Sequence, residues 1–473
     1  MSRFARRAFT LVILLAVPAG NDAVLAQTTH PTSNPSTSVP ADLRSPDPTG
    51  EITLADAAFA ALAGNPDLAV YSAEIRALDA RVLQAGLAPN PALSTEVEDF
   101  ARTGSGSSFR STQTTLSLSQ LIELGGKRLK RRKVAEFEKD RALWDYEVRR
   151  SEVLFEVSEA FLQVLALQEK LSLVDELVGL ASQSLSAVST QVVAGAVSPV
   201  EKQRAEMALA STRVERPQLE HDLVEARARL AATWGASDIH FTTVRGDLTA
   251  VRKPEPIESF LDRVHANPEL ARWSTEIAGR IASLDLERAR KKPDITLGAG
   301  TRWLNEDSSF AGVLEFSVPL PLFDRNQGAI LEATERLKKA QAERDAANVA
   351  VRADLTGAYQ QLHAAYDRLT SLRDERLPAA ATLYQQTREG HSRGLFRYLE
   401  VLDAQRTLFE LRREYLDSLF QFHRSLAEVE RLSGTSIYES ETLKVSADPA
   451  EEARRENRRD ATPIVTILPG AKK

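Results

Sequence analysis

An internal duplication with a period of about 200 residues restricts the possible folds more than any other feature of this chain. Its matching segments keep their order, and their offset hardly drifts from 202 to 198. The paired segments are Asn65-Pro66-Asp67-Leu68 with Asn267-Pro268-Glu269-Leu270, Pro91-Ala92-Leu93-Ser94 with Pro293-Asp294-Ile295-Thr296, Thr115–Ser119 with Val313–Ser317, and Trp234-Gly235 with Ser433-Gly434. A period this long is far above that of solenoid repeats. We therefore predict two repeats of one architecture, 51–235 and 257–435, joined by a linker over 236–256.

The two ends of the chain lie outside the duplication. A basic start with three arginines precedes an apolar run over 8–17, and small residues over 23–26 offer a cleavage point. This pattern predicts a secretory signal peptide over 1–26, with an apolar core too short for a stable membrane anchor. Residues 27–50, rich in Thr, Ser and Pro, are expected to form a flexible lead, and 436–473 a largely disordered tail.

Composition and motifs argue against an enzyme and against a nucleic-acid-binding protein. The formal net charge is −6, and the chain has no cysteine. Its seven histidines are scattered, without a His-x-x-x-His pair. Neither a Gly-rich phosphate loop nor a nucleophile elbow occurs. We therefore expect no catalytic site, no cofactor and no metal site.

The sequence pattern of each repeat predicts one helix, two strands, a long helix and a shorter helix, in this order. From Val153 to Val192, positions spaced alternately by four and three residues are all apolar, and a weaker series runs from Val351 to Leu372. Such a sustained heptad seam favours coiled-coil packing. A long helix over about 128–193 would extend roughly 100 Å. We expect the shorter helices 199–234 and 257–290 to stack end to end along it, and 397–433 with 52–86 to repeat this arrangement.

Four segments alternate between apolar and polar residues with a period of two, as β-strands with one wet face do. They are 92–100, 112–121, 294–303 and 310–318. This alternation is typical of a transmembrane barrel with a polar lumen. It also occurs in any half-buried sheet, so a soluble helical protein with two packed hairpins is the alternative.

Four strands are too few to close a barrel, because spanning barrels begin near eight strands. An open edge in lipid would leave backbone groups unpaired at several kcal/mol each. We therefore predict that three copies contribute twelve strands to a shared barrel. The small, polar hairpin tips over 103–108 and 305–309 suit outer loops.

Two strand-to-helix junctions resemble those of the outer membrane efflux protein (TolC) family, and most of all its heavy-metal, CzcC-like branch. They are Leu118-Ser119-Gln120-Leu121-Ile122-Glu123-Leu124-Gly125-Gly126-Lys127-Arg128 and Val318-Pro319-Leu320-Pro321-Leu322-Phe323-Asp324-Arg325-Asn326-Gln327-Gly328. The resemblance covers roughly 51–435. It implies a homotrimeric channel in the outer membrane on an α-helical periplasmic tunnel. It also implies a periplasmic adaptor and an inner-membrane resistance-nodulation-division (RND) pump as partners, and export of cobalt, zinc, cadmium, nickel or copper.

Elementary backbone chemistry accounts for these junctions. Prolines in the second junction stop a strand ladder because they lack an N–H. Asp324 or Asn326 is expected to cap the following helix, and Gly125-Gly126 to allow a sharp backbone change. The basic run over 127–133 is expected to form a solvated helix face, with contact to lipid phosphates as the alternative.

The far ends of the long helices are the second place where function is expected. By resemblance they are periplasmic tips that dock the adaptor or pump, formed by Gly195, Ser198 and Pro199 in one repeat and by Gly394, Leu395 and Phe396 in the other.

Acidic residues follow these tips. Glu400 and Asp403 share a helix face at a spacing of three. The resemblance implies that they line a constriction, together with Glu201. Arg204 stands where the second repeat has Asp403 and is expected to pair with a carboxylate in the closed state. The simpler interpretation is an acidic first turn that favours the helix N-terminus. A soluble periplasmic coiled-coil adaptor or scaffold is the alternative function for the whole chain.

Overall fold

The computed structural model describes residues 47–100 and 111–434, which belong to one compact unit. The predicted signal peptide, most of the predicted lead, the predicted tail and the hairpin tip over 103–108 lie outside the described residues. Gly50, the last residue of the predicted lead, is the first residue of a strand.

The element order repeats as the duplication predicts. The first repeat contains β1 (Gly50–Ile52), α1 (Leu54–Gly64), α2 (Pro66–Ala85), β2 (Ala92–Glu98), β3 (Gln113–Ile122), α3 (Lys127–Val193) and α4 (Pro199–Ala232). The linker contains β4 (Phe241–Val244). The second repeat contains α5 (Ile257–Arg263), the turn η2 (Val264–Ala266), α6 (Pro268–Arg290), β5 (Ile295–Leu304), β6 (Ser309–Ser317), α7 (Gln327–Ser371), η3 (Leu372–Arg376), α8 (Leu377–Ser392) and α9 (Tyr398–Ser433). None of the helices in the described part of the chain is both long and apolar enough to cross a membrane.

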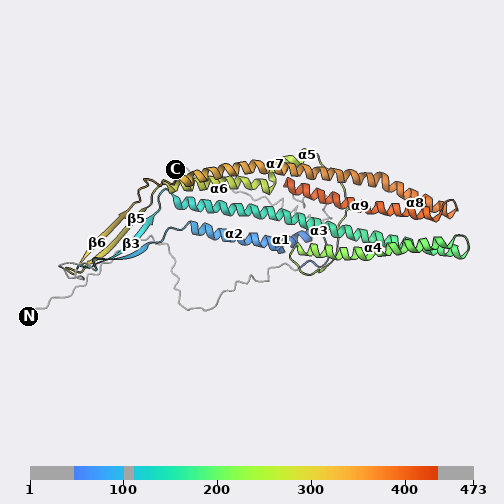
Figure 1. Ribbon diagram of the computed structural model, residues 1–473, viewed down its shortest axis with the longest axis horizontal. Coiled ribbons are helices and arrows are strands. Elements are labelled where there is room, and N and C mark those ends of the chain that lie inside the picture. The colour runs from blue at the N-terminus through green and yellow to red at the C-terminus, as the bar shows by residue number, and fades with distance from the viewer. Residues whose placement is uncertain (1–46, 101–110, 435–473) are drawn as a thin grey trace, which may run out of the picture. The chain divides into compact units, whose positions relative to one another are not determined.

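The four predicted strands form a single antiparallel sheet in the order β2-β3-β5-β6. The two hairpins therefore lie side by side, and β3 pairs with β5 over ten residues, from Gln113 opposite Leu304 to Ile122 opposite Ile295. Figure 1 shows the strands extending from the ends of the helices. Within the described chain the sheet is open at both β2 and β6.

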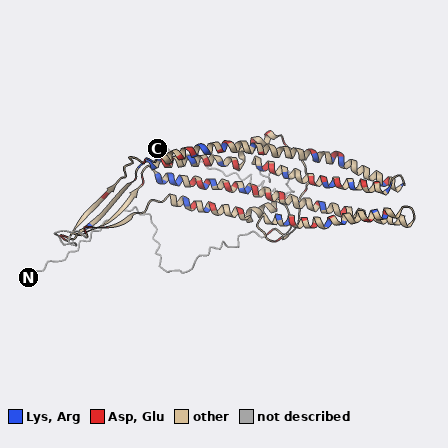
Figure 2. Ribbon diagram, in the orientation of Figure 1, with Lys and Arg blue, Asp and Glu red and all other residues tan. Residues whose placement is uncertain are grey.

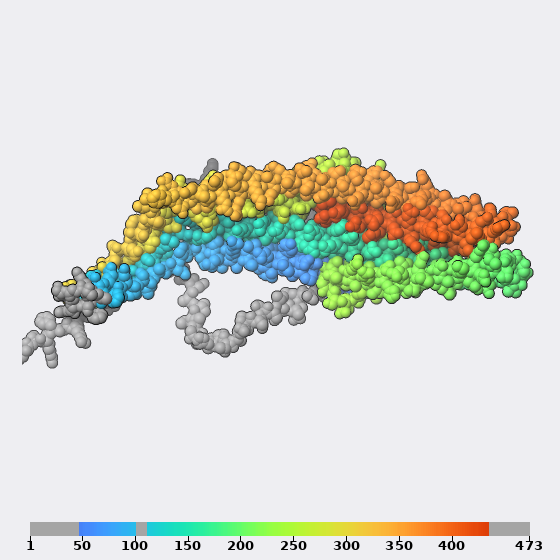
Figure 3. All heavy atoms as spheres, viewed as in Figure 1, coloured from blue at the N-terminus to red at the C-terminus, as the bar shows by residue number. Residues whose placement is uncertain are grey.

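The long helix α3 is the centre of the helical part. Its 67 residues correspond to about 100 Å, and the predicted heptad seam from Val153 to Val192 is buried or half-buried throughout. α3 packs against α1, α2, α4, α6 and α9. Figure 3 shows α1–α2 and α4 following one another along the same side of α3, and in Figure 1 α6 and α9 follow one another along another side.

The predicted stacking of the shorter helices is wrong in its pairing. α4 and α6 do both pack on α3, but they are not each other's continuation. α2 continues α4 of the same repeat, and α6 continues α9. α2 also packs on α3 rather than on α7. Sequence reasoning joined helices that are neighbours along the chain, whereas the structure joins helices about 165 residues apart.

The duplicated Asn-Pro motifs explain this stacking. The Asn65 side-chain oxygen accepts hydrogen bonds from the backbone N–H groups of Asp67 (2.9 Å) and Leu68 (3.2 Å), and its amide nitrogen donates to the Thr233 carbonyl at 2.7 Å. Asn267 repeats this, accepting from the Glu269 N–H at 2.7 Å and donating to the Leu432 carbonyl at 2.8 Å. Each asparagine therefore starts one helix and closes the end of another.

The same motifs interrupt two helices that the sequence predicted to be continuous. The segment 52–86 divides into α1 and α2, and 257–290 divides into α5, η2 and α6. Pro66 and Pro268 lack the N–H that would continue the preceding helix, and each is the first residue of a new one.

The linker between the repeats packs onto the middle of the bundle. β4 pairs in parallel with β1, and the Gln168 side-chain amide pairs with both the N–H and the carbonyl of Val244, at 3.0 and 2.9 Å. Farther along, a ring nitrogen of buried His423 donates to the Leu248 carbonyl at 2.9 Å. Burial lowers the pKa of His423, so the ring remains neutral in this contact.

The two long hairpins differ in the continuity of their first helix. α3 is continuous, whereas its counterpart changes to a π-turn over Leu372–Arg376 before Pro378. Proline cannot donate to the carbonyl one turn earlier, and a π-turn accommodates that missing hydrogen bond.

We expect Asn65→Ala and Asn267→Ala each to lower the free energy of unfolding by about 2–3 kcal/mol, because a helix cap is lost and a buried carbonyl loses its donor. Thermal or denaturant unfolding of the detergent-extracted protein measures this. Asn65→Asp keeps the acceptor and should cost less. Asn348→Ala, which removes only a hydrogen bond to the Arg344 carbonyl within α7, is the control and should change stability by under about 0.5 kcal/mol. Equal effects at Asn65 and Asn348 would contradict the role of the joint.

Candidate functional site

The sheet has two chemically different faces, as its alternation predicts. In register, Thr115 lies between Glu96 and Arg302 on the polar face, and Leu118 lies between Leu93 and Ala299 on the other. Leu314 and Phe316 on β6 extend the apolar face and are 90 % and 70 % exposed. An exposed apolar sheet face of this extent needs a cover that this chain does not supply within its described residues.

Arg302 organises the polar face across three strands. Its guanidinium donates to the Thr115 hydroxyl at 2.9 Å and to the Gln113 side-chain oxygen at 3.2 Å, and it pairs with Glu98 at 3.2 Å. The charge of Arg302 is therefore engaged by Glu98, while Glu96 and Glu315 keep the face acidic. A wet, charged surface of this kind lines aqueous lumens.

The junctions between strands and helices are closed by ion pairs. Buried Lys127 pairs with Asp294 at 2.8 Å, and Arg131 makes a bidentate contact with Glu123 at 2.6 and 3.1 Å. Lys130 donates to the Asp285 carbonyl at 3.1 Å. The prediction that the whole basic run is a solvated face is therefore wrong, because half-buried carboxylates and carbonyls of the second repeat and of the junction itself engage these cations.

The predicted backbone change at Gly125-Gly126 is confirmed, since both residues have positive φ, at 74° and 69°. The predicted cap of α7 is wrong. Asn326 precedes the helix but itself has a positive φ of 58°, and its amide donates instead to the carbonyl and the carboxylate of Glu287, both at 2.8 Å. Asp324 accepts from the Asn326 N–H at 2.9 Å rather than from the helix. The Asn326 side chain thus ties the start of α7 to α6.

The predicted tips are turns between antiparallel helices. Gly195 and Gly394 have positive φ, at 73° and 77°, which side chains rarely adopt. The Ser198 hydroxyl accepts from the Val200 N–H at 3.3 Å, and Pro199 begins α4. In the second tip Leu395 is 72 % exposed and Phe396 is partly exposed. Both tips are therefore exposed turns.

The predicted acidic residues occupy the helix turns next to these tips. The Glu400 carboxylate accepts from the Arg397 backbone N–H at 3.0 Å, as a helix-capping acid does. Glu400 and Asp403 are both exposed, as a shared outer face requires. The expected ion pair is present: Arg204 contacts Glu201 at 3.3 Å within α4.

Sequence reasoning missed Tyr398, which ties the second tip to the first repeat. Its buried hydroxyl shares a 2.7 Å hydrogen bond with Ser184 on α3. Burial raises the pKa of Tyr398, against the opposing effect of that hydrogen bond. Tyr398 also lines a cavity of about 530 Å³ between α3, α4 and α9, with Gln405 and Arg413 on its wall. The partners are more than 200 residues apart, so no local pattern reveals the contact.

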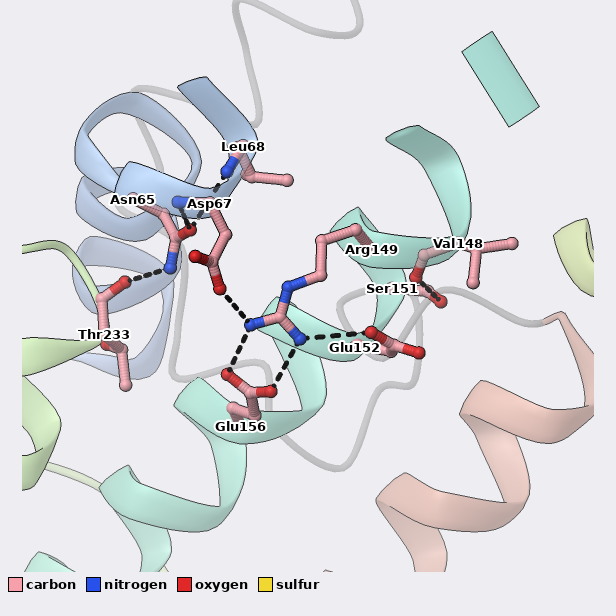
Figure 4. A network of polar contacts seen from close by, with 9 residues as sticks. All are labelled: Asn65, Asp67, Leu68, Val148, Arg149, Ser151, Glu152, Glu156 and Thr233. Atoms are coloured by element: carbon pink, nitrogen blue, oxygen red, sulfur yellow. Dashed lines mark hydrogen bonds and ion pairs between the residues drawn. The ribbon is translucent and has the colours of Figure 1, made fainter. Parts of the chain in front are cut away.

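A second missed group joins α2 to α3 (Figure 4). The Arg149 guanidinium contacts Asp67 at 2.7 Å, Glu152 at 3.1 Å and Glu156 at 2.8 Å. Burial alone would lower the pKa of Arg149, but the hydrogen bonds to the three carboxylates outweigh it and raise the pKa. One side chain of α3 therefore reinforces the joint that Asn65 makes. Among the described residues no group of three or more His, Asp or Glu side chains could hold a metal ion.

Comparison with known proteins extends these observations. Residues 59–236 and 264–435 match the family described as Outer membrane efflux protein. The chain is 32 % identical over 386 residues to the cobalt-zinc-cadmium resistance protein CzcC of Cupriavidus metallidurans, covering 81 % of this chain and 90 % of that protein. It is 27 % identical to the nickel-cobalt-cadmium resistance protein NccC of Alcaligenes xylosoxydans xylosoxydans, covering 64 % and 68 %.

Solved structures share the fold. The chain resembles CusC with a TM-score of 0.67 and 17 % identity, covering 81 % of this chain and 92 % of that one. It resembles the outer membrane protein VceC of Vibrio cholerae with a TM-score of 0.65 and 16 % identity, covering 81 % and 96 %.

We expect Gly390→Ala to disorganise the second tip, because the new Cβ would lie 2.3 Å from the Phe396 ring. Trypsin should then cut after Arg393 and Arg397 several-fold faster than in the parent protein. Gly357→Ala, with nothing within 4 Å of its Cβ, is the matched control on α7 and should leave the rate unchanged. An unaltered rate in Gly390→Ala would contradict the packing described for Phe396.

Proposed function

Because this chain belongs to the outer membrane efflux protein family, an outer membrane channel family whose helices lie in the periplasm, we propose that three copies form one conduit that exports divalent heavy-metal cations from the periplasm. The chain is an efflux channel subunit of a tripartite system and not an enzyme. A soluble periplasmic adaptor, the alternative drawn from the sequence, does not hold for a member of this family.

The open edges of the chain support the trimer. The sheet runs β2-β3-β5-β6, and the helices that continue it contact one another in the order α2, α3, α6, α7. β2 and α2 therefore lie at one edge of the chain, and β6 and α7 lie at the other edge. Joining β6 and α7 of one copy to β2 and α2 of the next closes both layers together. Unpaired strand edges in lipid cost several kcal/mol per group, which favours this closure.

The two faces of the sheet suit this arrangement. With three copies in a ring, the apolar face that carries Leu314 and Phe316 would contact lipid, and the face that carries Glu96 and Arg302 would line the lumen. Twelve strands would then surround a wet pore.

The tips are the surfaces that we propose for the partners. Gly195, Ser198 and Pro199 and, in the second repeat, Gly394, Leu395 and Phe396 would dock a periplasmic adaptor, and through it an RND pump. Exposed apolar residues at the end of a helical hairpin, such as Leu395, support this use.

The acids beside the second tip would form the constriction. Three copies of Glu400 and Asp403 give six carboxylates, which attract cations and repel one another. Arg204, held by Glu201 at 3.3 Å, would contribute to the closed state. A ring of carboxylates would suit the export of metal cations, and the names of the relatives point to cobalt, zinc, cadmium and nickel.

We further propose the domain division used above, with a signal peptide over 1–26, a lead over 27–50, repeats over 51–235 and 257–435, a linker over 236–256 and a tail over 436–473. The two matched family segments and the paired Asn-Pro joints support the two repeats.

Deletion of the chain tests the proposed substrate. We expect resistance to cobalt, zinc, cadmium or nickel to fall, with restoration by the intact gene, while tolerance of hydrophobic drugs stays unchanged. The purified protein should have three times the mass of one mature chain in light scattering. A monomer in detergent would contradict the channel proposal. Loss of tolerance to hydrophobic drugs alone would mean that the exported substrates are drugs and not metal cations.

Substitutions near the tips test the constriction in planar bilayers. Glu400→Gln with Asp403→Asn should lower the preference for cations over anions, because six negative charges leave the pore. Arg204→Ala should raise the closed-channel conductance. Arg213→Ala, two turns farther along α4, is the control and should change neither quantity. Unchanged conductance in Arg204→Ala would remove Arg204 from the gate.

A further inference from the structure

The ends of the helices that meet the sheet carry cations that nothing in the described chain neutralises. In Figure 2 the ribbon of the helices is blue, the colour of Lys and Arg, at several positions where the helices join the strands. Four acids of this region are paired with cations: Asp294 with Lys127, Glu123 with Arg131, Glu287 with Arg290, and Asp285 with Arg288. Asp324 accepts a hydrogen bond from the Asn326 N–H and keeps its charge, so it alone is left to offset the remaining cations. Positive charge is therefore left over.

Four cations make up this excess, which we call the junction cations: Arg128, Lys291, Lys292 and Arg325. All four are exposed, and none makes an ion pair with a residue that the structure describes. They belong to one region, because the Lys292 side chain lies against Gly125, and Asn326, beside Arg325, donates to the Glu287 carbonyl of α6. No acid occupies the first turn of α3 or α7, the two helices that start here, so the positive helix ends add to this charge.

An apolar loop lies beside the junction cations. Between β6 and α7, Leu320, Leu322 and Phe323 are 76 %, 65 % and 91 % exposed. Large apolar side chains next to excess cations are typical of surfaces that enter the headgroup region of a bilayer. The loop directly continues the apolar face of β6, the face proposed to contact lipid.

We propose that the junction cations and the loop residues Leu320, Leu322 and Phe323 bind anionic phospholipids of the periplasmic leaflet. This inference rests on the proposed function, since it requires the sheet to cross the membrane. The helices continue from this end of the strands and lie in the periplasm, so the adjacent leaflet is the phospholipid leaflet rather than the outer surface. Phosphates pair with the cations, and the loop side chains enter the acyl boundary.

The test compares phosphatidylglycerol with phosphatidylcholine on the full-length, delipidated protein in a neutral detergent. Native mass spectrometry measures the bound lipid, and thermal unfolding measures the stabilisation. We expect phosphatidylglycerol to bind about tenfold or more tightly than phosphatidylcholine, and the difference to shrink as salt rises from about 0.05 to 0.5 M. Equal binding of the two lipids by the parent protein would overturn the proposal.

Substitutions assign the effect to the surface. Gln at all four junction cations should abolish the preference for phosphatidylglycerol. Gln at four exposed cations elsewhere, Arg213, Lys253, Arg352 and Arg368, is the matched control and should preserve it. Leu322→Ser with Phe323→Ser should weaken the binding of both lipids equally. A preference that survives in the first variant, or is lost in the control, would overturn the proposal.

The oligomeric state separates this inference from the proposed function. If Leu322→Ser with Phe323→Ser dissociates the oligomer without changing lipid binding, a second copy covers the loop and the lipid proposal fails. If the parent protein conducts as a trimer but shows no lipid preference, only this inference fails. If the parent protein neither inserts into bilayers nor forms a trimer, the proposed function fails as well.

Discussion

A helix that ends inside a bundle leaves backbone groups without partners, and this chain ends four helices near the middle of one. The cost is avoided by two asparagines. Asn65 satisfies N–H groups at the start of α2 and a carbonyl at the end of α4, and Asn267 does the same for α6 and α9. Two short helices thereby continue each other beside α3. Without these joints the short helices could not cover a helix of 67 residues.

This joint also determines which surfaces remain open. The helices next to the sheet contact one another in the order α2, α3, α6, α7. Because α2 continues α4 on one side of α3, α2 lies at one edge of this helical layer and α7 lies at the other. The sheet inherits the same edges in β2 and β6. A chain with matching open edges in two consecutive layers suits a ring of copies. The duplication thus does more than double the length, since each repeat supplies one hairpin and one long helix to the wall that we propose the copies share.

The sequence allowed much of this to be predicted, and the errors are informative. Period-two alternation located all four strands to within about two residues, because a sheet with one wet face imposes that pattern directly. The heptad seam located α3 for the same reason. The stacking of the short helices was predicted wrongly, since Asn65 and Thr233 are brought together by a contact that no local periodicity records. The cap of α7 failed similarly, because Asn326 found a partner on α6.

The sequence by itself determined the repeat, the element types, the amphipathic strands and the family junction motifs, all of which depend on residues close together along the chain. Only the tertiary structure decided that Lys127, Lys130 and Arg131 close the junction, that Tyr398 reaches Ser184, and that Arg149 contacts three carboxylates. The physical reason is that a charge or a hydroxyl acts through whichever group lies within about 3 Å of it. Packing of distant segments selects that group.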